Sequence, residues 1–470
     1  MPPSQVAAPE AYGAVPAVAG PQAGGRFSAA RRAFGKGKPG TPPPPCRSGR
    51  RSGGPRDRAR PQRPVTASPP LPPELRRPPP GGAPLAEERG GHHTGTVRPV
   101  IATAAAVTTL AGLGTAFAAA RHAVDTTLRP ATDRALPGGG RLTVHATAPG
   151  RITLTRSLAS RRPGTYGLAG HGVHAVAGPV LEGLAESPDT VVRRLDSPGP
   201  HPPVRGTKVR MTPRLHTGNP ADALGIAYEE VTVPGELGPL PAWFVPGVRE
   251  TWVIAVHGLG ATREHTLNLL PFLHRRSLPV LAVAYRGDPG APRSPDGLGH
   301  LGDTEWRDLD AALRYAADRG ARRIVLHGWS TGATMALHTA ANSALRDRVT
   351  GLVLDSPVLD QEAALRALAR ARHTPAPLVP LLVRAARGRA GLYRDRVPVA
   401  ADARSVRVPT LVFHGPDDTV APWAASRELA AARPDLVTLR AVLDAPHAAM
   451  WNADPDAYEE ALRRFLTPLM

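Results

Sequence analysis

Residues 324–332 read IVLHGWSTG, and a helix-forming segment follows from Ala333. The apolar run Ile324–Leu326 is typical of a buried strand, so the pattern predicts a strand, a sharp turn and a helix in that order. Ser330 stands in the turn with a glycine two positions away on either side, the G-x-S-x-G arrangement of a nucleophile elbow. Small residues there let the strand and the helix approach closely while the hydroxyl points outward. Ser330 is therefore the candidate nucleophile.

Ser330 needs a base and a group that orients the base, because a serine hydroxyl is a weak nucleophile near neutral pH. Residues 409–422 read PTLVFHGPDDTVAP, an expected strand followed by an acidic loop. We expect Asp418 to be the orienting acid, and its neighbour Asp417 is the alternative. If Asp417 is not the acid, its expected role is to cap or form a turn. His447 follows the next expected strand and is the candidate base, which gives the chain order Ser, Asp, His.

Two backbone amides are the candidates for an oxyanion hole. The Thr331 N–H directly follows the nucleophile, and the Leu259 N–H lies in residues 257–260, HGLG, after an earlier expected strand. The other interpretation of residues 257–260 is an ordinary glycine-rich turn between a strand and a helix. His327 and His414 also end expected strands, and we expect them to pack beside the site.

Short apolar runs alternate with helix-like segments from about Tyr228 onward. Strands that alternate with helices indicate a mostly parallel sheet covered by helices on both faces, an α/β fold that we assign to residues 226–470. The expected strands are residues 252–256, 280–283, 324–326, 349–354, 410–413 and 437–442.

An Arg-rich insertion at residues 361–403 follows the strand after the elbow. It is partly amphipathic, which favours a pair of surface helices that also form a short lid. We expect three apolar side chains of this lid to line an acyl pocket: Leu378, Leu381 and Leu382.

These motifs resemble the α/β-hydrolase superfamily, and within it the serine aminopeptidase-like and prolyl-oligopeptidase-like hydrolases. The resemblance rests on residues 257–260, 328–332, 414–422 and His447, and it covers roughly residues 226–470. It implies cleavage of an ester, thioester or amide through an acyl-enzyme, with the serine attacking, the histidine carrying the proton and the aspartate orienting the histidine. It implies no metal and no organic cofactor.

Three functions are compatible with this set of residues. The first is an esterase or acyl hydrolase that acts on a small molecule. The second is a peptidase that acts on short peptides with the same catalytic groups. The third is a binding module without catalysis, which the intact set of Ser330, Asp418 and His447 argues against.

Residues 1–98 hold 21 of the 55 prolines and +11 of the formal charge of +19, so the rest of the chain is only mildly basic. No nucleic-acid-binding motif accompanies this charge, and we expect no nucleic-acid partner. Dense proline without apolar periodicity predicts a disordered tail at residues 1–97, unless the true start is Val97 and the upstream residues are a mis-assigned start. The single cysteine, Cys46, excludes an intrachain disulfide and a cysteine-based metal site.

Residues 98–121 form a separate segment whose apolar part, residues 99–120, contains no charged residue. At a rise of about 1.5 Å per residue, a helix of this length just crosses the hydrocarbon core of a bilayer. The segment therefore predicts a membrane signal anchor, or a signal peptide with the small-x-small cleavage site Ala116–Ala118; a buried Ala-rich helix is the other interpretation. The arginines before the segment predict that the N-terminus lies in the cytoplasm. The catalytic part would then lie outside the cytoplasm, either anchored in the membrane or secreted.

Residues 122–225 predict a small β-rich accessory region. Apolar and polar residues alternate over Leu142–Ala146, and the turn signal Pro149-Gly150 separates this run from another. We expect the region to pack on the hydrolase domain and to shape its substrate entrance. His171 and His174 are its candidates for facing a cleft.

Overall fold

The computed structural model describes residues 118–119, 121–130, 140–184, 187–371, 373–389 and 402–470. The chain divides into two compact units, Met1–Gly91 and His92–Met470, and all described residues lie in the second. The tail and nearly all of the apolar segment 99–120 therefore lie outside the described residues, and the predictions made for them stay predictions. Within the described ranges, no helix combines the length and the apolar character needed to cross a bilayer.

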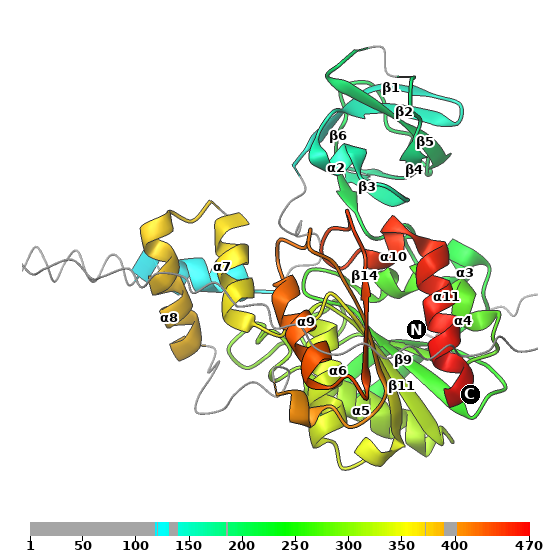
Figure 1. Cartoon of the computed structure of the whole chain (residues 1–470), viewed down its shortest axis with the longest axis vertical. Coiled ribbons are helices and arrows are strands. Elements are labelled where there is room, and N and C mark those ends of the chain that lie inside the picture. Colours follow the sequence, from blue (N-terminus) through cyan, green and yellow to red (C-terminus); the bar gives the residue numbers. More distant parts are fainter. Residues whose placement is uncertain (1–117, 120, 131–139, 185–186, 372, 390–401) are drawn as a thin grey trace, which may run out of the picture. The chain divides into compact units, whose positions relative to one another are not determined.

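An eight-stranded sheet forms the centre of the C-terminal part (Figure 1), in the order β14-β13-β12-β11-β9-β10-β8-β7. Strand β8 pairs antiparallel with β7 and β10, and the other pairs are parallel. The predicted mostly parallel sheet is confirmed, and its six expected strands are β9 to β14. The strand bounds are β7 Glu229–Gly235, β8 Gly238–Val245, β9 Thr251–Val256, β10 Val280–Val283, β11 Arg323–Trp329, β12 Val349–Asp355, β13 Thr410–His414 and β14 Val437–Ala441.

Helices cover both faces of this sheet, because successive strand residues point to opposite sides. Leu326 of β11 belongs to an apolar cluster with Leu309 of α5, whereas its neighbour Val325 belongs to a second cluster with Leu462 of α11. The helices of this part are α3 Pro220–Leu224, α4 Leu270–His274, α5 Trp306–Asp318, α6 Thr331–Asn342, α9 Trp423–Ala432, α10 Met450–Ala453 and α11 Pro455–Leu466.

The insertion after β12 contains the expected helix pair, α7 Gln361–Ala371 and α8 Val379–Arg389. Leu382 of α8 does not face the cavity described below, because it is buried in a cluster with Val124 and Leu128 from a helical segment at residues 121–128. Figure 1 draws that segment beside α7 and α8. Neither Leu378 nor Leu381 lines that cavity either, and Leu381 is exposed, so the pocket predicted for these leucines is not formed there.

The predicted β-rich region is present as a closed barrel of six antiparallel strands in the order β1-β2-β5-β4-β3-β6. Alternate side chains such as Val144 and Ile152 fill its interior. Closure leaves no unpaired strand edge, which explains how such short strands are stable. The elements are β1 Leu142–Ala148, β2 Arg151–Thr155, α2 Leu158–Arg161, β3 Tyr166–Gly170, β4 Val173–Val180, β5 Thr190–Ser197 and β6 Lys208–Thr212.

A fully buried arginine, Arg193 of β5, ties the segment after α2 to the barrel. Its Nε donates to the Gly178 carbonyl at 2.8 Å. Its two terminal nitrogens donate to the carbonyls of Ser160, Arg162 and Gly164 at 2.6 to 3.0 Å. Burial lowers the pKa of Arg193 to about 10, so the group is still charged at neutral pH. Every hydrogen bond that this buried cation donates thus goes to a backbone carbonyl.

The barrel is bonded to the C-terminal part through two buried asparagines. Asn452 of α10 donates from Nδ2 to the backbone carbonyls of Thr165 and Pro213, and the backbone carbonyl of Asn452 accepts from the Thr165 N–H. Asn268 donates to the Pro213 carbonyl and accepts from the Leu215 N–H. These bonds satisfy backbone groups of both parts and fix their contact.

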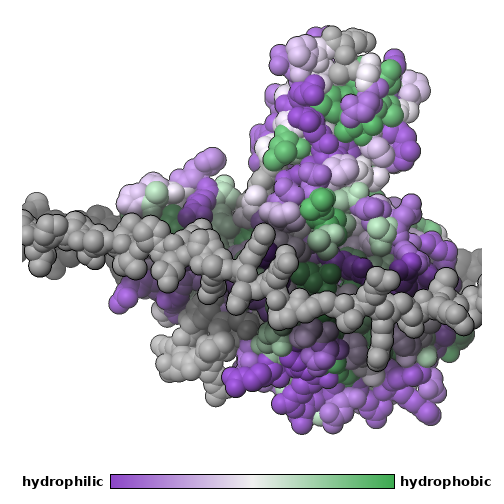
Figure 2. Space-filling view, viewed as in Figure 1, coloured by the Kyte–Doolittle hydropathy of each residue, from purple (hydrophilic) through white to green (hydrophobic). Residues whose placement is uncertain are grey.

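The face of the molecule seen in Figure 2 is mostly hydrophilic where the structure describes it, with smaller hydrophobic patches that include one on the barrel. Leu158 and Val204 are the large apolar side chains most exposed in the barrel region. Single exposed apolar residues are normal on folded domains, so these two residues are not evidence of a binding surface.

Candidate active site

Ser330 occupies a strained turn between β11 and α6. Its backbone has φ 54° and ψ −117°, a conformation that residues with a side chain rarely adopt, and its N–H donates to the Asp355 carbonyl at 2.8 Å. The flanking glycines make the turn possible. A Cβ on Gly328 would lie 2.4 Å from the carbonyl carbon of Gly332, and one on Gly332 would lie 2.3 Å from the Val256 oxygen.

The structure brings Ser330, His447 and Asp418 into one hydrogen-bonded chain. His447 Nδ1 lies 2.7 Å from Asp418 Oδ2, and His447 Nε2 lies 2.6 Å from Ser330 Oγ. The exposed fractions are only 3%, 4% and 9% for Ser330, His447 and Asp418. An ionised carboxylate only accepts, so Nδ1 donates to Asp418 and Nε2 accepts a hydrogen bond from the Ser330 hydroxyl. This is the tautomer that a general base for Ser330 needs.

Asp418 is surrounded by hydrogen-bond donors. Its Oδ1 accepts from the N–H groups of Val420 and Ala421, both at 2.8 Å, and its Oδ2 accepts from His414 Nε2 at 3.1 Å as well as from His447. Burial alone would raise the pKa of this carboxyl, but His447 and the hydrogen bond from His414 hold it well below its usual range. Asp418 therefore stays ionised at neutral pH.

The other residues considered from the sequence lie away from the serine. Asp417 accepts from the Asp444 N–H at 2.9 Å, so it closes a turn and does not contact His447. His327 lies 3.1 Å from the Tyr458 hydroxyl, and burial lowers its pKa to about 3. His414, expected only to pack nearby, contacts Asp418 directly and therefore fixes the orientation of the acid.

The loop after β9 packs against the serine turn. A Cβ on Gly258 would lie 2.6 Å from Ser330 Cβ, so the position tolerates only glycine without displacement of the turn. Leu259 comes next and lines the same cavity as Ser330. Thr331 begins α6, where N–H groups have no acceptor within the helix. His257 instead lies beneath this loop, with Nε2 2.8 Å from Asp288 Oδ2.

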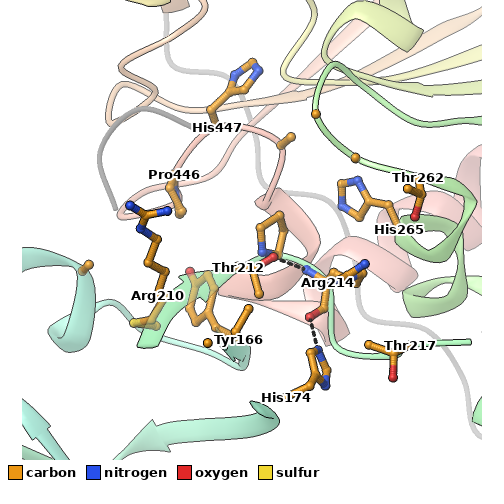
Figure 3. A pocket seen from close by; sticks show the side chains of 18 of the residues that line it. Tyr166, His174, Arg210, Thr212, Arg214, Thr217, Thr262, His265, Pro446 and His447 are labelled. Carbon is orange, nitrogen blue, oxygen red and sulfur yellow. Dashed lines mark hydrogen bonds between the residues drawn. The ribbon is translucent and has the colours of Figure 1, made fainter. Parts of the chain in front are cut away.

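A cavity of about 700 Å³ opens beside Ser330 and His447, between the β9 loop and the barrel. Figure 3 shows the labelled residues of its wall, among them Tyr166, His174 and Arg210 from the barrel. His171, the other histidine considered from the sequence, also lines it. The barrel therefore forms part of the wall of the candidate site, and the sequence carried no signal that Tyr166 and Arg210 would line it.

A second buried carboxyl supports the loop that carries His447. The Ser356 hydroxyl donates to Asp355 Oδ1 at 2.8 Å and accepts from the Ala448 N–H at 2.9 Å. Burial raises the pKa of Asp355 to about 7. Sequence reasoning missed this residue, although an aspartate that ends a strongly apolar strand is a recognisable signal.

In the part of the chain that the structure describes, no group of three or more His, Cys, Asp or Glu side chains is arranged to hold a metal ion.

Comparison with known proteins separates the barrel from the C-terminal part. Residues 253–466 match the model of the alpha/beta hydrolase family, and residues 143–212, nearly the whole barrel, match a domain of unknown function, DUF8805. An uncharacterized protein of Salmonella typhimurium, YfhR, is 27% identical over 232 residues, which cover 46% of this chain and 71% of that protein.

Several solved structures are also similar. An esterase of Pyrococcus furiosus is 22% identical, with a TM-score of 0.45, over 54% of this chain and 94% of the esterase. An esterase of Thermogutta terrifontis is 19% identical, with a TM-score of 0.36, over 51% of this chain and 98% of the esterase.

Replacing Asp355 by asparagine should change how stability depends on pH. Its pKa rises from an ordinary value of 3.8 to about 7 on folding, so the unfolded chain ionises first and the wild type loses stability as pH rises from about 4 to about 7. Asparagine stays neutral, so the variant should gain roughly 2–4 kcal/mol relative to the wild type across that window. Thermal unfolding at a series of pH values measures this difference, and parallel curves for the two proteins would contradict it.

Proposed function

Because residues 253–466 place this chain in the α/β-hydrolase superfamily, we propose that the protein is a serine hydrolase that cleaves an ester or a related acyl bond. The observation that carries the proposal is the hydrogen-bonded chain from Ser330 Oγ through His447 to Asp418. It ends on a serine hydroxyl in the wall of a cavity of about 700 Å³, a size that suits a small organic substrate.

In the first half of the proposed reaction, Ser330 Oγ attacks the carbonyl carbon while its proton passes to His447 Nε2. The ionised Asp418 stabilises the imidazolium that forms. The tetrahedral intermediate then collapses, His447 gives the proton to the leaving oxygen, and an alcohol departs from an acyl-enzyme. In the second half, water attacks the acyl group and gives its proton to His447. Ser330 recovers that proton as the acid leaves, so one ester and one water yield one acid and one alcohol.

The negative charge on the intermediate needs fixed donors near Ser330. We assign them to the N–H groups of Leu259, in the loop after β9, and of Thr331, the first residue of α6; the two segments meet at the serine turn. Backbone donors of this kind do not reorganise during the reaction, and removing one donor from such a site typically slows turnover about 100-fold or more.

Ser330→Ala should abolish both turnover and covalent labelling. We expect the wild type to react with a fluorophosphonate probe and to release nitrophenol from short-chain nitrophenyl esters, and the variant to be slower by roughly 10⁴-fold or more. Aminoacyl anilides, assayed in parallel, test the alternative that the protein is a peptidase. If the wild type neither reacts with the probe nor differs from the variant, the chain is a binding module on a hydrolase fold.

Asp418→Asn and Asp417→Asn form a matched pair that separates the catalytic acid from its neighbour. The change at Asp418 removes the charge that orients His447, so kcat should fall roughly 10⁴-fold. The change at Asp417 keeps an acceptor for the Asp444 N–H and should leave kcat within about twofold. Steady-state kinetics on a nitrophenyl ester measures both, and equal effects of the two variants would reject the assignment of Asp418.

We further propose that residues 99–120 export the hydrolase or anchor it in a membrane, with the catalytic part outside the cytoplasm. The support is the uncharged run of apolar residues after an Arg-rich stretch. N-terminal sequencing of the native protein should find a start after Ala118 if the segment is cleaved, or membrane-bound protein that retains the segment if it is an anchor. Native protein in the cytoplasmic fraction with the segment intact would reject the proposal.

A further inference from the structure

The cavity beside Ser330 has a cationic wall. Five of its lining residues are arginine or lysine and none is aspartate or glutamate; the five are Arg141, Arg162, Lys208, Arg210 and Arg214. Arg214 is paired with Glu264, which itself lies outside the wall. Arg210 forms no ion pair with any described residue, so its charge is uncompensated at the point where it meets the cavity.

Two donors in this wall are shielded from water and have no acceptor among the described residues. They are the hydroxyl of Tyr166, a side chain that is only 1% exposed, and the Nε of Arg210. They come from β3 and β6, which pair with each other, and Figure 3 draws both on the barrel side of the cavity. Burial raises the pKa of Tyr166 to about 12, so its phenol keeps its proton and acts as a donor at neutral pH.

Unpaired donors of this kind are costly in a folded protein. A buried donor without an acceptor destabilises a folded structure, and native proteins satisfy the great majority of such groups. Arg193 behind the wall shows the contrast, since its guanidinium donates to four carbonyls. Donors left unpaired in the wall of an open cavity therefore point to a ligand that brings the acceptors.

We propose that Tyr166 and Arg210 bind a carboxylate, or another small oxyanion, that the substrate carries in addition to its scissile acyl bond. This inference rests on the proposed function, because it names the substrate class of the same site. An oxyanion supplies several acceptor lone pairs and a negative charge, which matches one phenol and one unpaired guanidinium. A neutral substrate would leave the charge of Arg210 uncompensated, and a cationic one would be repelled.

A pair of esters that differ in one charge tests this proposal on the full chain. The probes are 4-nitrophenyl hydrogen glutarate, which ends in a carboxylate, and 4-nitrophenyl methyl glutarate, which ends in the neutral methyl ester. We expect kcat/KM to be at least about tenfold higher for the anionic ester at low salt, and this preference to shrink between about 20 mM and about 500 mM NaCl. Equal kcat/KM values for the two esters would overturn the proposal.

Three variants assign the preference to the barrel wall. Tyr166→Phe and Arg210→Gln should each lower the ratio of anionic to neutral kcat/KM severalfold, chiefly by raising KM for the anionic ester. Tyr166→Phe removes only a hydroxyl without a partner, so its unfolding temperature should match that of the wild type. Arg151→Gln, on the exposed outer side of β2, is the control and should leave the ratio unchanged. A preference that survives both wall variants would overturn the assignment.

Inhibition of the neutral ester's hydrolysis identifies the oxyanion. Stronger inhibition by glutarate indicates a carboxylate, stronger inhibition by inorganic phosphate indicates a phosphoryl group, and no inhibition by either contradicts an oxyanion site. Failure of this inference is distinct from failure of the proposed function. Hydrolysis of both esters at equal rates, lost in Ser330→Ala, rejects the oxyanion site alone, whereas hydrolysis of neither ester and no probe labelling reject the serine hydrolase.

Discussion

The C-terminal part depends on one close approach between backbone segments at Ser330. The serine sits at a positive φ, and three glycines, Gly258, Gly328 and Gly332, allow β9, β11 and α6 to meet there without side chains between them. Strain of this kind persists only where the surroundings over-determine it. Here two strands that are buried almost throughout, β9 and β11, and the first turn of α6 do so, and they leave the hydroxyl as the group that faces the cavity.

Buried charge is handled in two ways in this molecule. Asp418 and Arg193 are each enclosed by four hydrogen-bond partners, so both stay charged in the interior. Asp355 has fewer partners, and its pKa shifts toward neutrality. Charge is kept where an ordered network of donors or acceptors surrounds it, and such networks specify one arrangement of the groups around them.

The sequence was sufficient for the α/β fold of residues 226–470, because each strand from β9 to β14 is a short apolar run with a helix-like segment between neighbours. The β7–β8 hairpin was not predicted, since Pro234, Pro239 and Pro241 argue against a strand and are tolerated here near the edge of the sheet. The grouping of Ser330, Asp418 and His447 was predictable for a topological reason. All three follow the carboxyl ends of strands in one parallel sheet, so their loops gather at one edge.

The barrel and its wall could not be predicted in the same way. Its closure requires β1 to pair with β6, and no local pattern encodes a contact over that separation. Tyr166 and Arg210 look like ordinary strand residues, and only the structure shows that they line the cavity with unpaired donors. The expectation that Leu378, Leu381 and Leu382 line a pocket failed for a related reason, since Leu382 is covered by the segment at residues 121–128, far away in the sequence.

Asn452 joins the segment that carries His447 to the barrel. It lies five positions after His447, on the short helix α10, and it donates hydrogen bonds to the backbone carbonyls of Thr165 and Pro213. Thr165 in turn directly precedes Tyr166. The imidazole of His447 and the phenol of Tyr166 are therefore connected through two short stretches of backbone and the hydrogen bonds between Asn452 and Thr165. A ligand bound at Tyr166 would therefore be connected, through Thr165 and the hydrogen bonds of Asn452, to the loop that carries His447.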